Sequence, residues 1–172
     1  MKPNDKLLKK TGESTEIMED GKNKESSRQA VTFNIGKEEY AIDIMLVIEI
    51  IKSARITPVP LSLDFVKGVV NLRGKVVPVV DLKKKFSITF QENPKEVRFI
   101  VVEIEKKIIG FQVDKVKEVI SIPLSSIDPA PSIISGISQN YIEGVGRIDG
   151  RLIILLNIEK LLSEKELEKL SV

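Results

Sequence analysis

The 172 residues are 42% hydrophobic and 30% charged, a composition typical of a globular protein with one domain or two small ones. The formal net charge is only +2, which argues against the dense positive charge that nucleic-acid binders use to contact phosphates. Because the chain has no cysteine and no histidine, it lacks disulfides, thiolate nucleophiles, sulfur-ligated metals and the commonest general base. We therefore expect neither a catalytic site nor a cofactor.

Residues 1–29 are rich in Lys, Glu, Ser, Asn and Gly and show no sustained hydrophobic period. Such a segment cannot bury enough apolar surface to offset the entropy lost on ordering, so we expect a flexible tail. It also lacks the apolar core of a signal peptide, and apolar runs such as residues 152–156 are far below the ~20 residues of a membrane span. These features predict a cytoplasmic protein without membrane insertion.

From Ala30 onward, short runs rich in Ile and Val predict an all-β fold. The first two runs alternate apolar and polar residues on either side of a turn at residues 36–39, which indicates a hairpin. Further strand-like runs cover residues 47–51, 69–72, 76–82, 99–104, 108–113, 116–122 and 151–158. Pro78 lies inside one of them and predicts an edge strand or a bulge, because proline has no N–H for a ladder.

A short helix is predicted at the C-terminal end, in residues 163–172. Ser163 and Glu166 have the spacing of a capping box, in which each side chain accepts a hydrogen bond from the other residue's backbone N–H. Leu167 and Leu170 follow on one face of this helix.

The chain also contains an internal repeat. Residues 65–86 (FVKGVVNLRGKVVPVVDLKKKF) align without a gap with residues 141–162 (YIEGVGRIDGRLIILLNIEKLL), and residues 35–51 match residues 104–120. Chance similarity among Ile- and Val-rich strands is the alternative, but it leaves the matched glycines unexplained. One unit is too small to close a core alone, so we predict two packed small barrels, with a groove at their junction for a partner.

Two glycine patterns resemble nucleotide-binding loops but fail in detail. Gly68 and Gly74 are separated by five residues instead of four, and Val76 stands where the phosphate-binding loop requires Ser or Thr. Gly144 and Gly146, followed by Gly150, miss the dinucleotide fingerprint by one position and precede a strand. Neither pattern supports a small-molecule substrate or cofactor.

Arg73 occupies an unusual position in the repeat. Asp149–Gly150 is a favoured hairpin turn because both residues tolerate positive φ, and the aligned pair in the first half is Arg73–Gly74. If the two turns share a geometry, Arg73 adopts a left-handed conformation at a cost of about 1–2 kcal/mol. A residue that breaks a local rule without local gain is a candidate for function. If the first turn has another geometry, Arg73 is an ordinary exposed arginine.

Glu49 interrupts the apolar run of residues 44–51. Strand alternation points Glu49 to the same side as Val47 and Ile51. A carboxylate flanked by exposed aliphatic residues is typical of an interface, but also of an ordinary outward strand face. Both interpretations remain open on the residues alone.

Several motifs together resemble the signature of the CheW family of bacterial chemotaxis coupling proteins. They are residues 39–44 (EYAIDI), 57–60 (TPVP), 68–74 (GVVNLRG), 76–82 (VVPVVDL), 110–119 (GFQVDKVKEV) and 150–155 (GRLIIL). The match runs from about Ala30 to Leu162, although the N-terminal tail is longer than the family leads us to expect. The resemblance implies a CheW-like domain over residues 30–165, made of two intertwined five-stranded barrels related to SH3 domains, with the repeat units at 35–86 and 104–162.

The resemblance also implies a function. Proteins of this family bridge the cytoplasmic tip of chemoreceptors to the regulatory domain of the histidine kinase CheA, and the receptor lies in the groove between the barrels. The positions that match the family's receptor-binding residues are Val47, Glu49, Gly68, Arg73 and Val119. The same fold occurs inside the kinase and in the coupling protein CheV. Since this chain has no room for a kinase core or a receiver domain, the stand-alone, non-enzymatic adaptor fits best.

Two other functions stay open as alternatives. A nucleic-acid-binding tandem barrel would need basic and aromatic residues clustered on one strand face, and we do not find such a cluster in the sequence. An enzyme would be indicated by a bound metal or cofactor.

Overall fold

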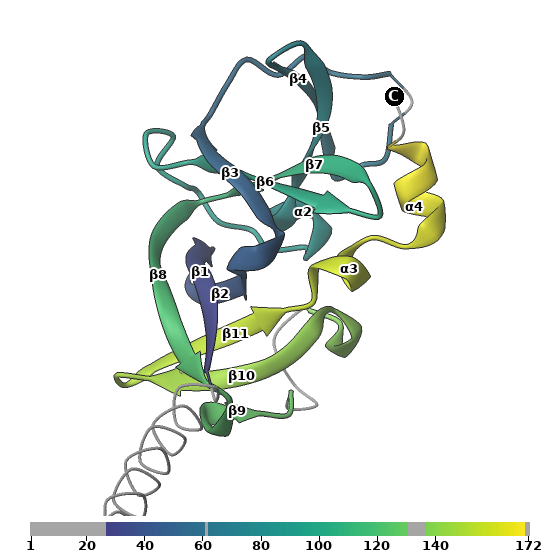
Figure 1. The fold of residues 1–172 in the computed structure, drawn as a ribbon. Coiled ribbons are helices and arrows are strands. Elements are labelled where there is room, and N and C mark those ends of the chain that lie inside the picture. Colours follow the sequence, from purple (N-terminus) through teal and green to yellow (C-terminus); the bar gives the residue numbers. More distant parts are fainter. Residues whose placement is uncertain (1–26, 61, 131–136, 171–172) are drawn as a thin grey trace, which may run out of the picture.

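The computed structural model describes residues 27–60, 62–130 and 137–170, which form two curved β-sheets and several short helices (Figure 1). The tail predicted for residues 1–29 lies outside the described residues up to position 26, and the first strand begins at Ser27. No helix in the described ranges is long and apolar enough to cross a membrane.

The strands divide between a six-stranded sheet, ordered β8-β1-β2-β11-β10-β9, and a five-stranded sheet, ordered β3-β6-β7-β5-β4. The six-stranded sheet contains β1 (Ser27–Ile35), β2 (Glu38–Asp43), β8 (Lys115–Pro123), β9 (Ile127–Asp128), β10 (Ile142–Ile148) and β11 (Arg151–Leu156). The five-stranded sheet contains β3 (Val47–Lys52), β4 (Val66–Leu72), β5 (Lys75–Asp81), β6 (Arg98–Ile104) and β7 (Lys107–Val113). The helices are η1 (Ile44–Leu46), α2 (Leu82–Lys85), η2 (Leu124–Ser126), η3 (Gln139–Tyr141), α3 (Ile158–Leu161) and α4 (Glu164–Lys169).

The internal repeat is confirmed element by element. β4, β5 and α2 recur as β10, β11 and α3, and β2 and β3 recur as β7 and β8. Even the smallest pairing recurs, because the isolated bridge between Thr57 and Val69 corresponds to the pair formed by Asp128 and Val145. The all-β prediction is therefore correct, with each repeat providing one set of strands.

Each half of the chain gives its first hairpin to the other half's sheet. β1 and β2 lie with β8 to β11, whereas β6 and β7 lie with β3 to β5. Each exchanged hairpin is held by a parallel strand pair, and the two pairs are related by the repeat. Leu155 lies opposite Ala41 in one sheet, and Val79 lies opposite Gly110 in the other. In the six-stranded sheet the two outermost strands, β8 and β9, are joined directly by η2, so the end of one edge strand lies close to the start of the other. The predicted intertwining of the two halves is thus confirmed, although one sheet has six strands instead of the predicted five, because the two-residue strand β9 adds to its edge.

The two sheets share one hydrophobic core. Its main cluster takes Phe33 and Tyr40 from the six-stranded sheet, Ile100 and Phe111 from the five-stranded sheet, and Phe86 from the segment after α2. Neighbouring rings along Phe33, Tyr40 and Phe86 lie 6.0–6.1 Å apart between centroids. The protein's own side chains therefore fill the interior of the junction, so a partner at this junction must bind on its outer surface.

Pro78 was predicted to lie on an edge strand or at a bulge, and the edge strand is wrong, because β5 runs between β7 and β4. The β4–β5 pair does contain a bulge next to Pro78, but it lies in β4, between Val66 and Gly68. The strand tolerates the missing N–H because its ladder with β7 begins one residue later, at Val79. In the other sheet Ile154, which aligns with Pro78, is paired with Tyr40 inside the corresponding ladder. Each ladder has three residue pairs, but the one beside Pro78 begins two residues later in the repeat than its counterpart, which begins at Ile153.

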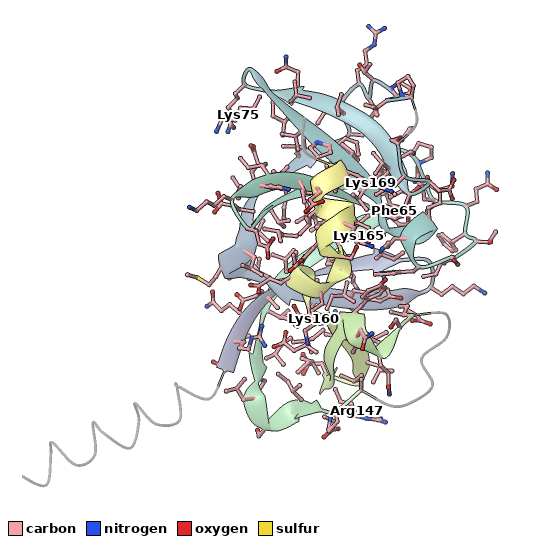
Figure 2. The ribbon with its side chains drawn as sticks, turned by 90° about the vertical axis from the view of Figure 1, so that its right-hand side faces the viewer. Phe65, Lys75, Arg147, Lys160, Lys165 and Lys169 are labelled. Atoms are coloured by element: carbon pink, nitrogen blue, oxygen red, sulfur yellow. The ribbon has the colours of Figure 1, made fainter. Side chains whose placement is uncertain are left out.

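The predicted C-terminal helix and its capping box are present in α4. Ser163 Oγ accepts a hydrogen bond from the Glu166 N–H at 3.1 Å, and Glu166 Oε1 accepts one from the Ser163 N–H at 2.9 Å. Leu167 of the helix and Leu170, directly after it, are buried, whereas Lys165 and Lys169 are exposed on the helix (Figure 2). Local sequence therefore determines where this helix starts, and two leucines attach it to the body.

α4 follows one barrel in the chain but is bound to the other. Lys85 Nζ of α2 donates to both carboxylate oxygens of Glu166, at 3.0 and 2.8 Å, and lies 4.3 Å from the centroid of the Phe65 ring. Lys107 Nζ of β7 donates to the carbonyl oxygen of Leu167 at 3.0 Å. The helix consequently clamps the two barrels together.

We expect Glu166→Gln to loosen this clamp in a pH-dependent way. Burial acts to raise the pKa of Glu166, but hydrogen bonds from Lys85 and the Ser163 backbone outweigh it and leave the pKa lowered from 4.5. A lowered pKa means that this carboxylate stabilises the fold above pH 4.5 and that the contribution disappears as the pH falls through the folded-state pKa. Glutamine keeps the cap but removes the charge, which should cost about 2 kcal/mol near neutral pH.

Urea unfolding of both proteins at about pH 7 and about pH 3 measures this effect. The difference in unfolding free energy should shrink toward zero in acid. An equal difference at both pH values would show that the charge pairing with Lys85 is not its source.

Candidate functional site

The turn between β4 and β5 has the strained geometry that the repeat suggested. Arg73 and Gly74 have φ values of 52° and 83°, close to the 51° and 76° of Asp149 and Gly150 in the turn between β10 and β11. Asn71 Oδ1 accepts a hydrogen bond from the Gly74 N–H at 2.9 Å, which braces the turn. The first of the two interpretations of Arg73 is therefore correct, and the left-handed arginine costs about 1–2 kcal/mol relative to an extended one.

Arg73 holds its guanidinium in place through a two-pronged ion pair with Glu49 of β3. Nη1 donates to Oε1 and Nη2 donates to Oε2, both at 3.1 Å. The Arg73 side chain is nonetheless 82% exposed, whereas that of Glu49 is 24% exposed. An ion pair this open to water contributes at most about 1 kcal/mol, so it does little more than offset the strain. Its main effect is to orient an accessible guanidinium.

The second barrel has no counterpart of this pair on its turn. Glu118, which aligns with Glu49, accepts a hydrogen bond from Arg151 at 3.0 Å, and Arg151 also reaches the buried Glu39 at 3.2 Å. Arg151 belongs to strand β11, and the second turn carries Asp149 instead. The exposed arginine at a hairpin tip is thus a property of the first barrel alone.

Burial alternates along β3, with Ile48 and Ile50 the more exposed residues, at 49% and 39% exposure. The prediction that Glu49 shares a side with Ile51 is confirmed, but the prediction that it shares one with Val47 is wrong, because a bulge shifts the register between Val47 and Glu49. The interpretation of Glu49 as an outward-facing residue is therefore wrong. The repeat could have singled out Ile50, because it aligns with Val119, which is also exposed, at 52%.

Gly68 makes a close backbone approach possible. Its φ is 146°, and a Cβ atom there would lie 2.2 Å from the carbonyl oxygen of Thr57. Thr57 and Val69 exchange two backbone hydrogen bonds, of 2.8 and 2.9 Å, directly beside it. The geometry accordingly gives Gly68 a structural role, that of letting the segment before β4 dock on that strand.

The structure brings together some of the predicted site residues and not others. Glu49 and Arg73 touch and, with Ile48 and Leu72, help to line a shallow pocket of about 160 Å³ whose residues all come from the five-stranded sheet and its turn. Val47 packs against the shared core with its partner Val102, whereas Glu49 is paired with Val101 on the other side of a bulge in β3. Val119 stands on β8, in the six-stranded sheet, opposite Val31. The five residues therefore span both barrels.

Known proteins resemble this chain over most of its length. The family model described as the CheW-like domain matches residues 29–166. The chemotaxis protein CheW of Treponema pallidum is 36% identical over 147 residues, which are 83% of this chain and 86% of that protein. The CheW of Helicobacter pylori is 38% identical over 136 residues, or 79% and 82%. The crystal structure of the scaffolding protein TtCheW from Thermoanaerobacter tengcongensis matches with a TM-score of 0.75 and 37% identity, covering 81% of this chain and 90% of that one.

Proposed function

Because this chain belongs to the CheW-like domain family, we propose that it couples the cytoplasmic tips of chemoreceptors to the regulatory domain of the histidine kinase CheA. The chain is a chemotaxis scaffold protein that acts by binding and not by catalysis. Its place of action in this proposal is the cytoplasm, where it meets the membrane only through the receptors.

The observation that carries the receptor contact is the oriented guanidinium of Arg73. A guanidinium has five N–H donors in a fixed plane, and Glu49 takes two of them. The remaining donors are free to meet carboxylates or carbonyl oxygens on a helical hairpin. Ile48, which lines the same pocket, is exposed and apolar, so a receptor helix meets an apolar contact beside the anchor, and Ile50 and Val119 are further exposed apolar residues on β3 and β8.

The first barrel is the proposed contact for the kinase. The kinase's regulatory domain has the same fold as this chain, so the contact has approximate symmetry and can repeat into rings. An interface of about 1,200–1,600 Å² in total is sufficient, because many weak contacts reinforce one another in such an assembly.

Reconstitution tests the proposed function directly. CheA autophosphorylation is measured with chemoreceptor fragments, with and without this protein, and with and without receptor stimulus. We expect the kinase rate to respond to the stimulus only when the protein is present. A rate that ignores it in both cases would contradict the proposal, and a mobility shift of DNA that weakens steeply with salt would favour the nucleic-acid alternative instead.

A further inference from the structure

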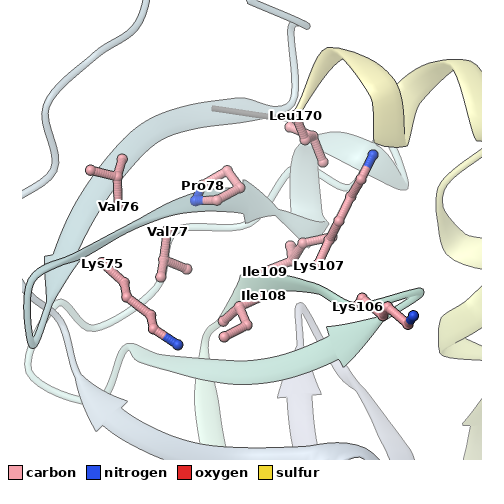
Figure 3. A pocket seen from close by; sticks show the side chains of 9 residues that line it. All are labelled: Lys75, Val76, Val77, Pro78, Lys106, Lys107, Ile108, Ile109 and Leu170. Carbon is pink, nitrogen blue, oxygen red and sulfur yellow. The ribbon is translucent and has the colours of Figure 1, made fainter.

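A cavity of about 510 Å³ opens between β5 and β7 just before the point where their ladder begins, at Val79 (Figure 3). We call it the β5–β7 notch and define it by the starts of these two strands, Lys75–Pro78 and Lys106–Ile109, together with Leu170 after α4. It lies beside the Arg73 pocket and shares Lys75, Val77 and Ile108 with it.

The notch exists because two strands that pair further on diverge here. Val79, Val80 and Asp81 face Gly110, Phe111 and Gln112 in the ladder. The residues before them pair outward only, those of β5 with β4 and those of β7 with β6. In any strand, half of the backbone N–H and C=O groups point toward each neighbour, so the starts of β5 and β7 turn such groups toward the notch. The notch therefore offers two strand edges that face each other.

The lining of the notch is positively charged. It includes three lysines, and none of the described residues that line it is acidic. Lys75 and Lys106 are exposed, whereas Lys107 is held by the carbonyl oxygen of Leu167. Between the lysines lie apolar side chains, among them Val76, which is 49% exposed. Apolar surface surrounded by lysines favours an occupant that alternates apolar and acidic residues.

We propose that the β5–β7 notch binds an extended, acidic segment of a partner protein, which adds to the sheet as a short strand. The strand edges supply backbone hydrogen bonds, and each face of the notch offers the segment both an apolar side chain and a lysine, Ile108 with Lys75 on one face and Val76 with Lys107 on the other. A nucleic acid would bring the charge but no regularly spaced backbone N–H and C=O groups, so it fits this site less well. The notch adjoins the proposed receptor contact, but Arg73 and Glu49 are not among the residues that line it.

The probe is a fluorescein-labelled peptide of alternating Glu and Val residues, and its anisotropy is measured against the full chain. Pro78→Ile copies the residue of the second repeat and should let the ladder extend across the notch. We expect this variant to weaken peptide binding at least about tenfold and to raise the urea midpoint of unfolding. Lys106→Glu should also weaken binding by about tenfold, whereas the same change at Lys165, exposed on α4, should leave it unchanged.

Three results would each overturn the proposal. They are undiminished peptide binding by a folded Pro78→Ile variant, equal binding of a matched Lys and Val peptide, and equal binding of oligo-dT. Co-sedimentation of the Pro78→Ile variant with receptor fragments distinguishes a failure of this proposal from a failure of the proposed function. The variant should keep receptor binding even though it loses peptide binding.

Discussion

Arg73→Glu is expected to abolish co-sedimentation of the protein with receptor fragments while leaving the fold intact. The variant places a carboxylate beside Glu49 and removes the donors that the proposed receptor contact requires. Loss of a desolvated interfacial charge costs about 2–5 kcal/mol, which lowers affinity by a factor of about thirty or more. The change in unfolding free energy should stay within about 1 kcal/mol, because the pair is exposed.

A charge-swapped double variant, Arg73→Glu with Glu49→Arg, tests whether Arg73 contacts the receptor directly or only stabilises the turn through its ion pair. It restores an ion pair between β3 and the turn, yet it moves the guanidinium off the hairpin tip, so receptor binding should stay lost. Recovery of binding would show that the pair only holds the turn in shape. Asp149→Arg, at the equivalent turn of the second barrel, is the matched control and should bind receptor normally. Unchanged binding by Arg73→Glu itself would remove Arg73 from the site.

Gly68→Ala is expected to destabilise the protein by about 4 kcal/mol. The positive φ alone strains an alanine by about 1–2 kcal/mol, and the clash of its Cβ with the Thr57 carbonyl adds a further ~1–3 kcal/mol. Backbone atoms give way less readily than a side chain, so relief requires breaking the two hydrogen bonds between Thr57 and Val69. Urea unfolding followed by circular dichroism measures the loss.

Gly74→Ala is the matched control for this effect. Gly74 also has positive φ, at 83°, but a Cβ there would meet nothing within 4 Å. This variant should therefore lose only about 1 kcal/mol. If Gly68→Ala keeps normal stability and still fails to bind receptor, Gly68 belongs to the contact surface instead of the scaffold.

The strands, the repeat and the hairpin turns could be predicted because each is written in a local pattern. The alternation of apolar and polar residues predicted the hairpin before Tyr40, and the aligned glycines of the repeat predicted the geometry of the turn at Arg73. The exchange of hairpins could not be derived in this way, because it depends on parallel pairs such as Leu155 with Ala41, far apart in the chain. Only the family resemblance supplied it.

The candidate site could likewise be predicted only in part, where local sequence determines it. The strain at Arg73 followed from the alignment, whereas its partner Glu49 lies on a different strand and could be identified only in three dimensions. Which face of β3 points outward depends on how the barrel closes, and this is why Ile48 and Ile50 were missed. Pro78 was assigned to an edge because proline is commonest there, but a ladder that starts late serves equally well.

The exchanged hairpins also determine the order in which the polypeptide can be completed during synthesis. β2 finds its parallel neighbour only when β11 has emerged, so the sheet that holds the first strand must wait for nearly the last. Pairings this distant in the chain make folding slow, and a nascent or truncated chain would leave the edge of β2 unprotected. The same topology means that neither barrel can be cut away and kept as a working fragment.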